Sequence, residues 1–154
     1  MKHYKEQLFK VLSRNDTGET GGHQSGISIP KAVAGSSIFP AMTRAVLNPR
    51  RDVTFIDEGG NAWNLQYIYY NDKYHGKPAG KCHDECRLTC TNAYIHEHNI
   101  KAGDQIWFAI DDDGKRYIGF VRAGQQIENN YREEDGVIIL KIRSWTSIKK
   151  ETYE

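Results

Sequence analysis

Residues 52–70 read Asp-Val-Thr-Phe-Ile-Asp-Glu-Gly-Gly-Asn-Ala-Trp-Asn-Leu-Gln-Tyr-Ile-Tyr-Tyr. Two segments rich in β-branched and aromatic residues, Val53–Ile56 and Trp63–Tyr70, flank a polar turn that contains two glycines. This pattern predicts a β-hairpin. A second hairpin is predicted where 105–110 and 116–122 flank the turn Asp111-Asp112-Asp113-Gly114.

Shorter segments predict the remaining elements. Further strands are expected at 27–29, 87–90 and 137–143, and short helices at 2–12, at 92–98 and after Pro40 within 36–48. About seven strands with few helices favour a mainly β fold that closes, or nearly closes, into a barrel. Because no linker or repeat divides the chain, we expect residues 1–154 to form a single domain.

The composition argues against several classes of protein. The chain has 21 Lys and Arg against 20 Asp and Glu, so its formal net charge of +1 provides no overall attraction to nucleic acid or membranes. The longest apolar runs have about four residues, too few to cross a bilayer, and the N-terminal residues lack the apolar segment of a secretory signal. All three cysteines lie within 82–90, which does not suit a secreted disulfide framework. We therefore expect a cytoplasmic protein without a membrane partner.

Motifs for metal binding and catalysis are incomplete. Cys82, His83, Cys86 and Cys90 lack the paired knuckle spacing of structural zinc sites, so loop or core thiols are favoured. No nucleophile elbow, P-loop or dinucleotide fingerprint is present. We expect no catalytic residue, no metal ligand and no cofactor in this chain. A small nuclease or metal-binding enzyme that uses the Cys/His loop 75–90 remains the alternative.

Two long polar loops, 13–26 and 73–87, contain the remaining candidate residues. Residues 73–87 include four Lys and Arg, two acids and two histidines, a local formal charge of +2. Such loops suit double-stranded DNA, because Lys and Arg contact phosphates while Arg, Gln, Asn and acidic side chains can read base edges. Composition by itself also fits ordinary solvated loops.

Residues 12–31, Leu-Ser-Arg-Asn-Asp-Thr-Gly-Glu-Thr-Gly-Gly-His-Gln-Ser-Gly-Ile-Ser-Ile-Pro-Lys, resemble the signature of the EcoRII N-terminal effector-domain family of type IIE restriction endonucleases. Residues 69–73 and 83–89 resemble the same family. The resemblance implies a seven-stranded, open DNA-binding pseudobarrel, similar to the plant auxin-response and abscisic-acid-response DNA-binding domains. Two protruding segments, here called the N-arm (13–30) and the C-arm (73–89), would hold DNA in the major groove.

The resemblance also assigns residues. The family's base-reading positions match His23, Ser28, Lys81, His83, Glu85, Cys86 and Arg87. With the other polar residues of the two loops, the expected DNA-binding set is Arg14, Asn15, Asp16, His23, Gln24, Ser25, Ser28, Lys73, Lys77, Lys81, His83, Asp84, Glu85, Cys86 and Arg87. Glu85 and Arg87 are two residues apart, so on a strand they would lie on one side and could pair.

Three of these positions depart from the family pattern: His83 replaces a common arginine, Cys86 an aromatic residue or lysine, and Ser28 a tyrosine. Because a histidine cannot reproduce the bidentate guanine contact of arginine, these changes bear on the target sequence.

By resemblance, the chain would be a monomeric, non-catalytic effector domain that binds a short site similar to CCWGG. A separate, C-terminal nuclease domain would then cleave DNA, and Mg²⁺ is expected only there. A stand-alone DNA-binding regulator with the same arms is the other alternative.

Overall fold

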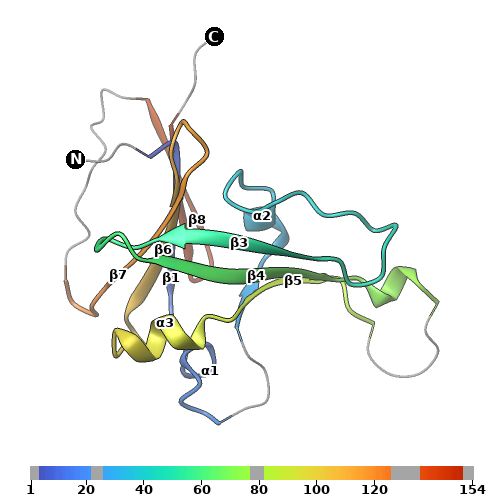
Figure 1. The fold of residues 1–154 in the computed structure, drawn as a ribbon, viewed down its shortest axis with the longest axis horizontal. Helices are drawn as coiled ribbons and strands as arrows, with labels where there is room; N and C mark the ends of the chain where they lie inside the picture. Colours follow the sequence, from blue (N-terminus) through green and yellow to red (C-terminus); the bar gives the residue numbers. More distant parts are fainter. Residues whose placement is uncertain (1–3, 22–25, 77–81, 126–135, 151–154) are drawn as a thin grey trace.

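The structure, a computed structural model, describes residues 4–21, 26–76, 82–125 and 136–150. These residues form nine strands in one curled sheet (Figure 1). The strand order across the sheet is β2-β5-β4-β3-β7-β6-β1-β9-β8, and adjacent strands are antiparallel except β3 and β7. The predicted mainly β class is therefore confirmed, with two strands more than the seven that were expected.

The strands are β1 (Glu6–Val11), β2 (Ile27–Ile29), β3 (Arg50–Ile56), β4 (Ala62–Tyr70), β5 (Glu85–Thr89), β6 (Gln105–Ile110), β7 (Arg116–Val121), β8 (Val137–Ile142) and β9 (Trp145–Lys150). Three short α-helices, α1 (Arg14–Thr17), α2 (Lys31–Ala34) and α3 (Asn92–Glu97), and one 3₁₀ turn, η1 (Asp72–Tyr74), accompany them. None of these helices has the length and apolar content needed to cross a membrane.

Both predicted hairpins are confirmed as β3–β4 and β6–β7. Each turn is organised by the aspartate that begins it. Asp57 Oδ1 accepts hydrogen bonds from the amides of Gly59 and Asn61 at 2.9 Å each, and Asp111 Oδ1 accepts from the amides of the corresponding residues 113 and 115. This local chemistry explains why sequence reasoning could place both turns.

The helix expected at 2–12 is wrong, because Glu6–Val11 forms strand β1. This strand lies between β6 and β9, and both of its faces are buried, with Leu8 in the main core and Phe9 in a smaller cluster on the other face. Its polar residues are consequently buried with partners, which hides the two-residue alternation of a strand. Glu6 Oε2 accepts from the amide and hydroxyl of Ser37, and Lys10 Nζ lies 2.6 Å from Asp16 Oδ2.

The helix expected after Pro40 is also wrong, because residues 36–48 run as turns and bends and the helix of this region is α2. A buried side chain from another part of the chain holds this segment. Asn71 donates its amide protons to the carbonyls of Thr43 and Val46 and accepts from the amide of Asn48. The segment therefore satisfies its backbone through tertiary contacts that leave no periodic pattern in the sequence.

The strands β1 and β9 account for the two that sequence analysis did not predict. Strand β9 follows the predicted β8 after a tight turn at Arg143, which has φ of +54°. Its six residues, Trp-Thr-Ser-Ile-Lys-Lys, offer little apolar alternation, and Trp145 is its only fully buried side chain.

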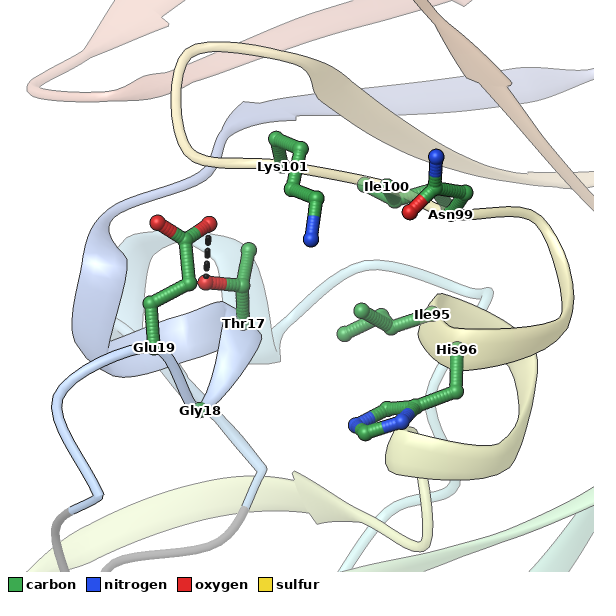
Figure 2. A pocket seen from close by; sticks show the side chains of 8 residues that line it. All are labelled: Thr17, Gly18, Glu19, Ile95, His96, Asn99, Ile100 and Lys101. Atoms are coloured by element: carbon green, nitrogen blue, oxygen red, sulfur yellow. Dashed lines mark hydrogen bonds between the residues drawn. The ribbon is translucent and has the colours of Figure 1, made fainter.

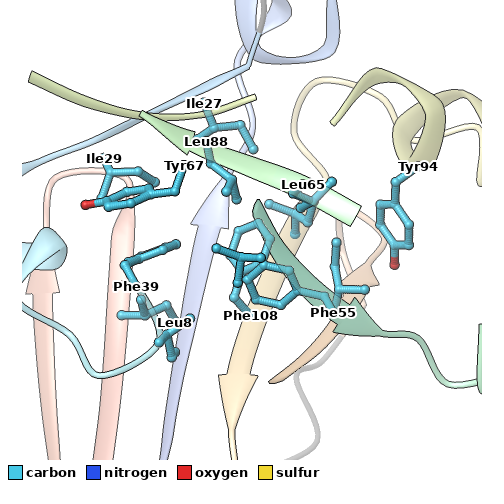
Figure 3. Packing of buried hydrophobic residues seen from close by; sticks show 14 of the residues in the cluster. Leu8, Ile27, Ile29, Phe39, Phe55, Leu65, Tyr67, Leu88, Tyr94 and Phe108 are labelled. Atoms are coloured by element: carbon cyan, nitrogen blue, oxygen red, sulfur yellow. The ribbon is translucent and has the colours of Figure 1, made fainter. Parts of the chain in front are cut away.

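The main core lies inside the curl of the sheet, where side chains from β1 to β7, α3 and the 36–48 segment meet (Figure 3). Phe108 from β6 packs against Phe55 with ring centroids 5.3 Å apart, and Phe39 stacks on Tyr67 at 5.0 Å. A smaller apolar cluster covers the opposite face of β6 and includes Trp107.

We expect Gly119→Ala to lower the free energy of unfolding by about 1–3 kcal/mol, as overpacking typically does. Gly119 is directly opposite Trp107 in the β6–β7 pair, and an added Cβ atom would lie 2.1 Å from the indole ring. Urea unfolding followed by circular dichroism measures the change. Gly35→Ala is the matched control, because Gly35 has a right-handed φ of −76° and open space around its Cα; equal stability of the two variants would contradict the packing argument.

Candidate functional site

The residues where each arm joins the sheet, here called its root, are neighbours in the sheet. Strand β2 ends the N-arm, strand β5 ends the C-arm, and the two pair antiparallel with Ser28 opposite Arg87. Segments that are about 60 residues apart in the sequence therefore present their side chains on one surface.

A row of side chains crosses four strands on the outward face of this part of the sheet. Ser28 is opposite Arg87, Arg87 is opposite Ile68, and Ile68 is opposite Arg50. Directly paired residues share a face, so Arg87 of β5 and Arg50 of β3 flank Ile68, which is itself only 4% exposed. Arg87 is half-buried, and its Nη2 donates to the carbonyl of Gly26 at 3.2 Å, which links it to the N-arm.

Alternation along β5 separates the predicted contact residues into two groups. Glu85 and Arg87 lie on the same face of β5, as expected from their spacing, and this face is the outward one. Cys86 is on the inward face, where it packs against the core and contacts the Tyr67 hydroxyl, and burial raises the pKa of its thiol. Cys86 therefore lies on the face opposite to Arg87 and is not part of the candidate surface.

In the N-arm, Asp16 has a structural position. The Asp16 amide donates to Ser13 Oγ at 3.1 Å and its carboxylate accepts from the Ser13 amide at 2.9 Å, a capping box at the start of α1. The same carboxylate pairs with Lys10 at 2.6 Å, and both side chains are only 10% exposed. Arg14 and Asn15, by contrast, are exposed on the same helical turn. Sequence analysis missed this role of Asp16, although the Ser-x-x-Asp spacing was a signal for it.

A hollow of about 190 Å³ lies beside the N-arm, between α1 and α3 (Figure 2). Glu19 lines it, and its carboxylate accepts from Thr17 Oγ1 at 2.9 Å and from the Ala102 amide at 2.8 Å. These bonds lower the pKa of Glu19, with the backbone contact as the largest cause. The carboxylate in this hollow thus fastens the N-arm to the body of the protein.

Hydrogen bonds join the start of the C-arm to the segment that leads into β5. The Asp72 carboxylate accepts from the backbone amide of His83, and its Oδ2 lies 2.9 Å from His83 Nδ1. The Lys73 amide donates to the carbonyl of His83 at 3.2 Å. These bonds with His83, the side-chain bond first, lower the pKa of Asp72. Lys73 is exposed, so its ammonium group is on the surface of the arm.

The carboxylate of Asp84 is surrounded by donors. Lys31 Nζ lies 2.5 Å from Oδ2, the Tyr69 hydroxyl donates to Oδ1 at 2.7 Å and the Tyr74 hydroxyl donates to Oδ2 at 3.1 Å. The bond from Lys31, followed by that from Tyr69, holds the pKa of Asp84 well below its usual range. Sequence analysis did not find these three partners, because no local pattern joins residues so far apart in the chain.

Five predicted contact residues lie outside the described part of the chain: His23, Gln24, Ser25, Lys77 and Lys81. Within the described ranges, no group of three or more His, Cys, Asp or Glu side chains is arranged to hold a metal ion. There Cys82 and Cys90 are exposed free thiols.

Comparison with known proteins identifies the family. The matching family model is described as restriction endonuclease EcoRII, N-terminal, and it matches residues 4–110. The chain belongs to this family.

Two kinds of relative share this segment. The type II restriction enzyme EcoRII of Escherichia coli is 38% identical over 68% of this chain and 26% of that enzyme. Auxin response factor 3 of Oryza sativa subsp. japonica is 27% identical over 78% of the chain and 14% of that protein, and auxin response factor 3 of Arabidopsis thaliana is 28% identical over 75% and 17%. The chain therefore spans only 14–26% of the length of these relatives.

Solved structures establish the fold class. The FUS3 protein in the Arabidopsis FUS3–DNA complex superposes with a TM-score of 0.56 at 19% identity, covering 75% of this chain and 96% of that one. A hypothetical Arabidopsis thaliana protein superposes with a TM-score of 0.50 at 18% identity, covering 82% and 100%. The likeness confirms the pseudobarrel fold that the resemblance implied.

We expect Asp16→Ala to lower the free energy of unfolding by about 3 kcal/mol, because Lys10 would remain buried without its partner and α1 would lose its cap. Chemical denaturation of the variant measures this change. Asn15→Ala, an exposed substitution on the same turn, is the control and should change stability by less than about 0.5 kcal/mol. A stable Asp16→Ala variant would show that the buried pair contributes nothing to the fold.

Proposed function

We propose that this chain is a sequence-specific, double-stranded DNA-binding domain that reads a short site through the major groove with its N-arm and C-arm. The observation that carries the proposal is the β2–β5 pairing, which joins the two arms at their roots and presents Ser28, Arg87 and Arg50 on one outward face. Membership of the EcoRII N-terminal family and the fold shared with a DNA-bound protein support it.

In this proposal, the contacts divide by chemistry. The cationic residues Arg14, Lys73, Lys77 and Lys81 contact phosphates and set the register of the protein on the duplex. Arg87, Glu85, His83 and Ser28 approach base edges, with His23, Gln24 and Ser25 from the N-arm. With Nδ1 of His83 directed at Asp72, its Nε2 is the ring nitrogen directed away from that carboxylate. Asn15 is exposed beside the cationic Arg14, so it belongs to the same proposed DNA-contact surface.

We further propose that the domain is the non-catalytic effector part of a restriction endonuclease, as the 38% identity to EcoRII suggests. It would bind DNA as a cytoplasmic monomer without a cofactor, and its site would be similar to CCWGG. A C-terminal nuclease domain in the full-length protein would then supply Mg²⁺-dependent cleavage. Selection of binding sites from a random duplex pool at a stated salt concentration tests the binding function and the site together.

A stand-alone DNA-binding regulator is the second candidate, and the similarity to the auxin response factors favours it. The two candidates differ in what the full-length protein does to DNA. Cleavage of a plasmid with Mg²⁺ by the full-length protein, but not by residues 1–154, supports the effector role. Cleavage by residues 1–154 alone would instead favour an enzyme that uses the loop at 75–90.

Arg87→Ala should weaken binding to the selected duplex by about 1–3 kcal/mol and relax preference at one base pair, because a bidentate arginine contact specifies the base it binds. Fluorescence anisotropy with a panel of single-base variants of the duplex measures both effects. Binding of the selected and random duplexes equal to that of the parent protein would remove Arg87 from the interface.

Lys77→Ala should weaken binding to all duplexes to a similar degree and reduce the slope of log K against log salt by about one, as expected for the loss of a phosphate contact. Lys115→Ala is the matched control, because Lys115 is exposed in the β6–β7 turn and not in either arm. A salt slope that changes equally in both variants would indicate a general charge effect and not an arm contact.

A further inference from the structure

The Asp84 carboxylate connects three separate elements at the root of the C-arm. Asp84 immediately precedes β5, and its side chain is only 11% exposed. Its partners are Lys31 at the start of α2, Tyr69 on β4 and Tyr74 in η1. Lys31 follows directly after the N-arm, so one carboxylate joins the end of the N-arm to both sides of the C-arm.

A second layer of contacts extends this connection to the 43–48 segment. Arg44 Nε donates to the Tyr69 hydroxyl at 3.2 Å, and the Arg44 guanidinium lies 4.3 Å from the centre of the Tyr74 ring. The Tyr69 hydroxyl therefore accepts from Arg44 and donates to Asp84, which fixes the direction of the hydrogen-bond chain. His75 Nε2 lies 2.8 Å from the carbonyl oxygen of Arg44, so the arm is held on this side as well.

The hydrogen bonds of Asp84 and the orientation of Glu85 indicate different roles for these two neighbouring residues. Three donors, one of them charged, occupy three of the about four acceptor positions of the Asp84 carboxylate, whose side chain is only 11% exposed. A cytosine amino group would have to reach the remaining acceptor position, on Oδ1 of this largely buried carboxylate. Glu85, on the outward face of β5 beside Arg87, has the orientation that a reading residue requires.

We propose that Asp84 is a positioning residue that sets the separation of the N-arm and C-arm before DNA binds, and that it does not read a base. The proposal rests on the DNA-binding function proposed above. Its physical basis is preorganisation: an arm that is already held at its bound separation loses less conformational entropy on binding.

A positioning role for Asp84 and simple charge repulsion between Asp84 and DNA predict opposite changes in binding affinity when Asp84 is neutralised. Removing a negative charge close to DNA should strengthen binding if Asp84 only repels phosphates. If Asp84 positions the arms, Asp84→Asn should instead weaken binding of the selected duplex by about tenfold while the ranking of single-base variants stays unchanged.

Hydrogen–deuterium exchange of the DNA-free protein provides the readout that does not depend on DNA. In Asp84→Asn, amides at 72–76 and 82–84 should exchange about tenfold faster, while those of β6 and β7 remain as in the parent. Glu85→Gln is the matched control, with the same change of charge one residue away, and it should leave exchange at 72–76 unchanged. Lys31→Met, which removes the cationic partner, should reproduce the faster exchange.

Every outcome either supports or overturns the positioning role of Asp84. Tighter binding, an altered ranking of bases or unchanged exchange in Asp84→Asn would overturn the positioning role. If the parent protein binds no duplex in the selection experiment, the proposed function fails, and the exchange data still decide whether Asp84 holds the arms together.

Discussion

The pairing of β2 with β5 is the contact on which the arrangement of the candidate site depends. It forces the ends of two distant loops into adjacent positions, and it requires the chain to approach β5 very closely at Gly26. This residue has φ of +90°, and a Cβ atom at this position would lie 2.4 Å from the carbonyl oxygen of Leu88. Only glycine satisfies both conditions without strain, so this one residue allows the N-arm to enter the sheet.

Acidic side chains hold the roots of the two arms. Asp16 and Glu19 fasten the N-arm to β1 and to the backbone at Ala102, while Asp72 and Asp84 fasten the C-arm. Three of these four, Asp16, Asp72 and Asp84, lie against a lysine or histidine side chain. Hydrogen bonds lower the pKa of Glu19, Asp72 and Asp84, which favours their charged form. The arms are therefore anchored by charges that the protein itself neutralises, which leaves exposed lysines and arginines for a polyanionic partner.

Local sequence chemistry accounts for the elements that could be predicted. The turns begun by Asp57 and Asp111 are organised by side-chain contacts within four residues, so both hairpins were visible in the sequence. The helix predicted for 2–12 failed for the opposite reason. Glu6 and Lys10 of β1 find their partners elsewhere in the chain, at Ser37 and Asp16, and without those partners the strand does not look like one.

The same distinction applies to the candidate site. The sequence by itself determined the family, the two polar loops and the placement of Glu85 and Arg87 on one side of a strand, because strand alternation and a long contiguous motif are local properties. Only the tertiary structure showed that Cys86 faces the core, that Asp16 pairs with the buried Lys10 and that Asp84 is held by donors from three other elements, because these partners are not set by local sequence. A polar residue in a loop can bind a ligand or brace the loop, and its burial and its donors, which are set by the whole fold, decide between the two.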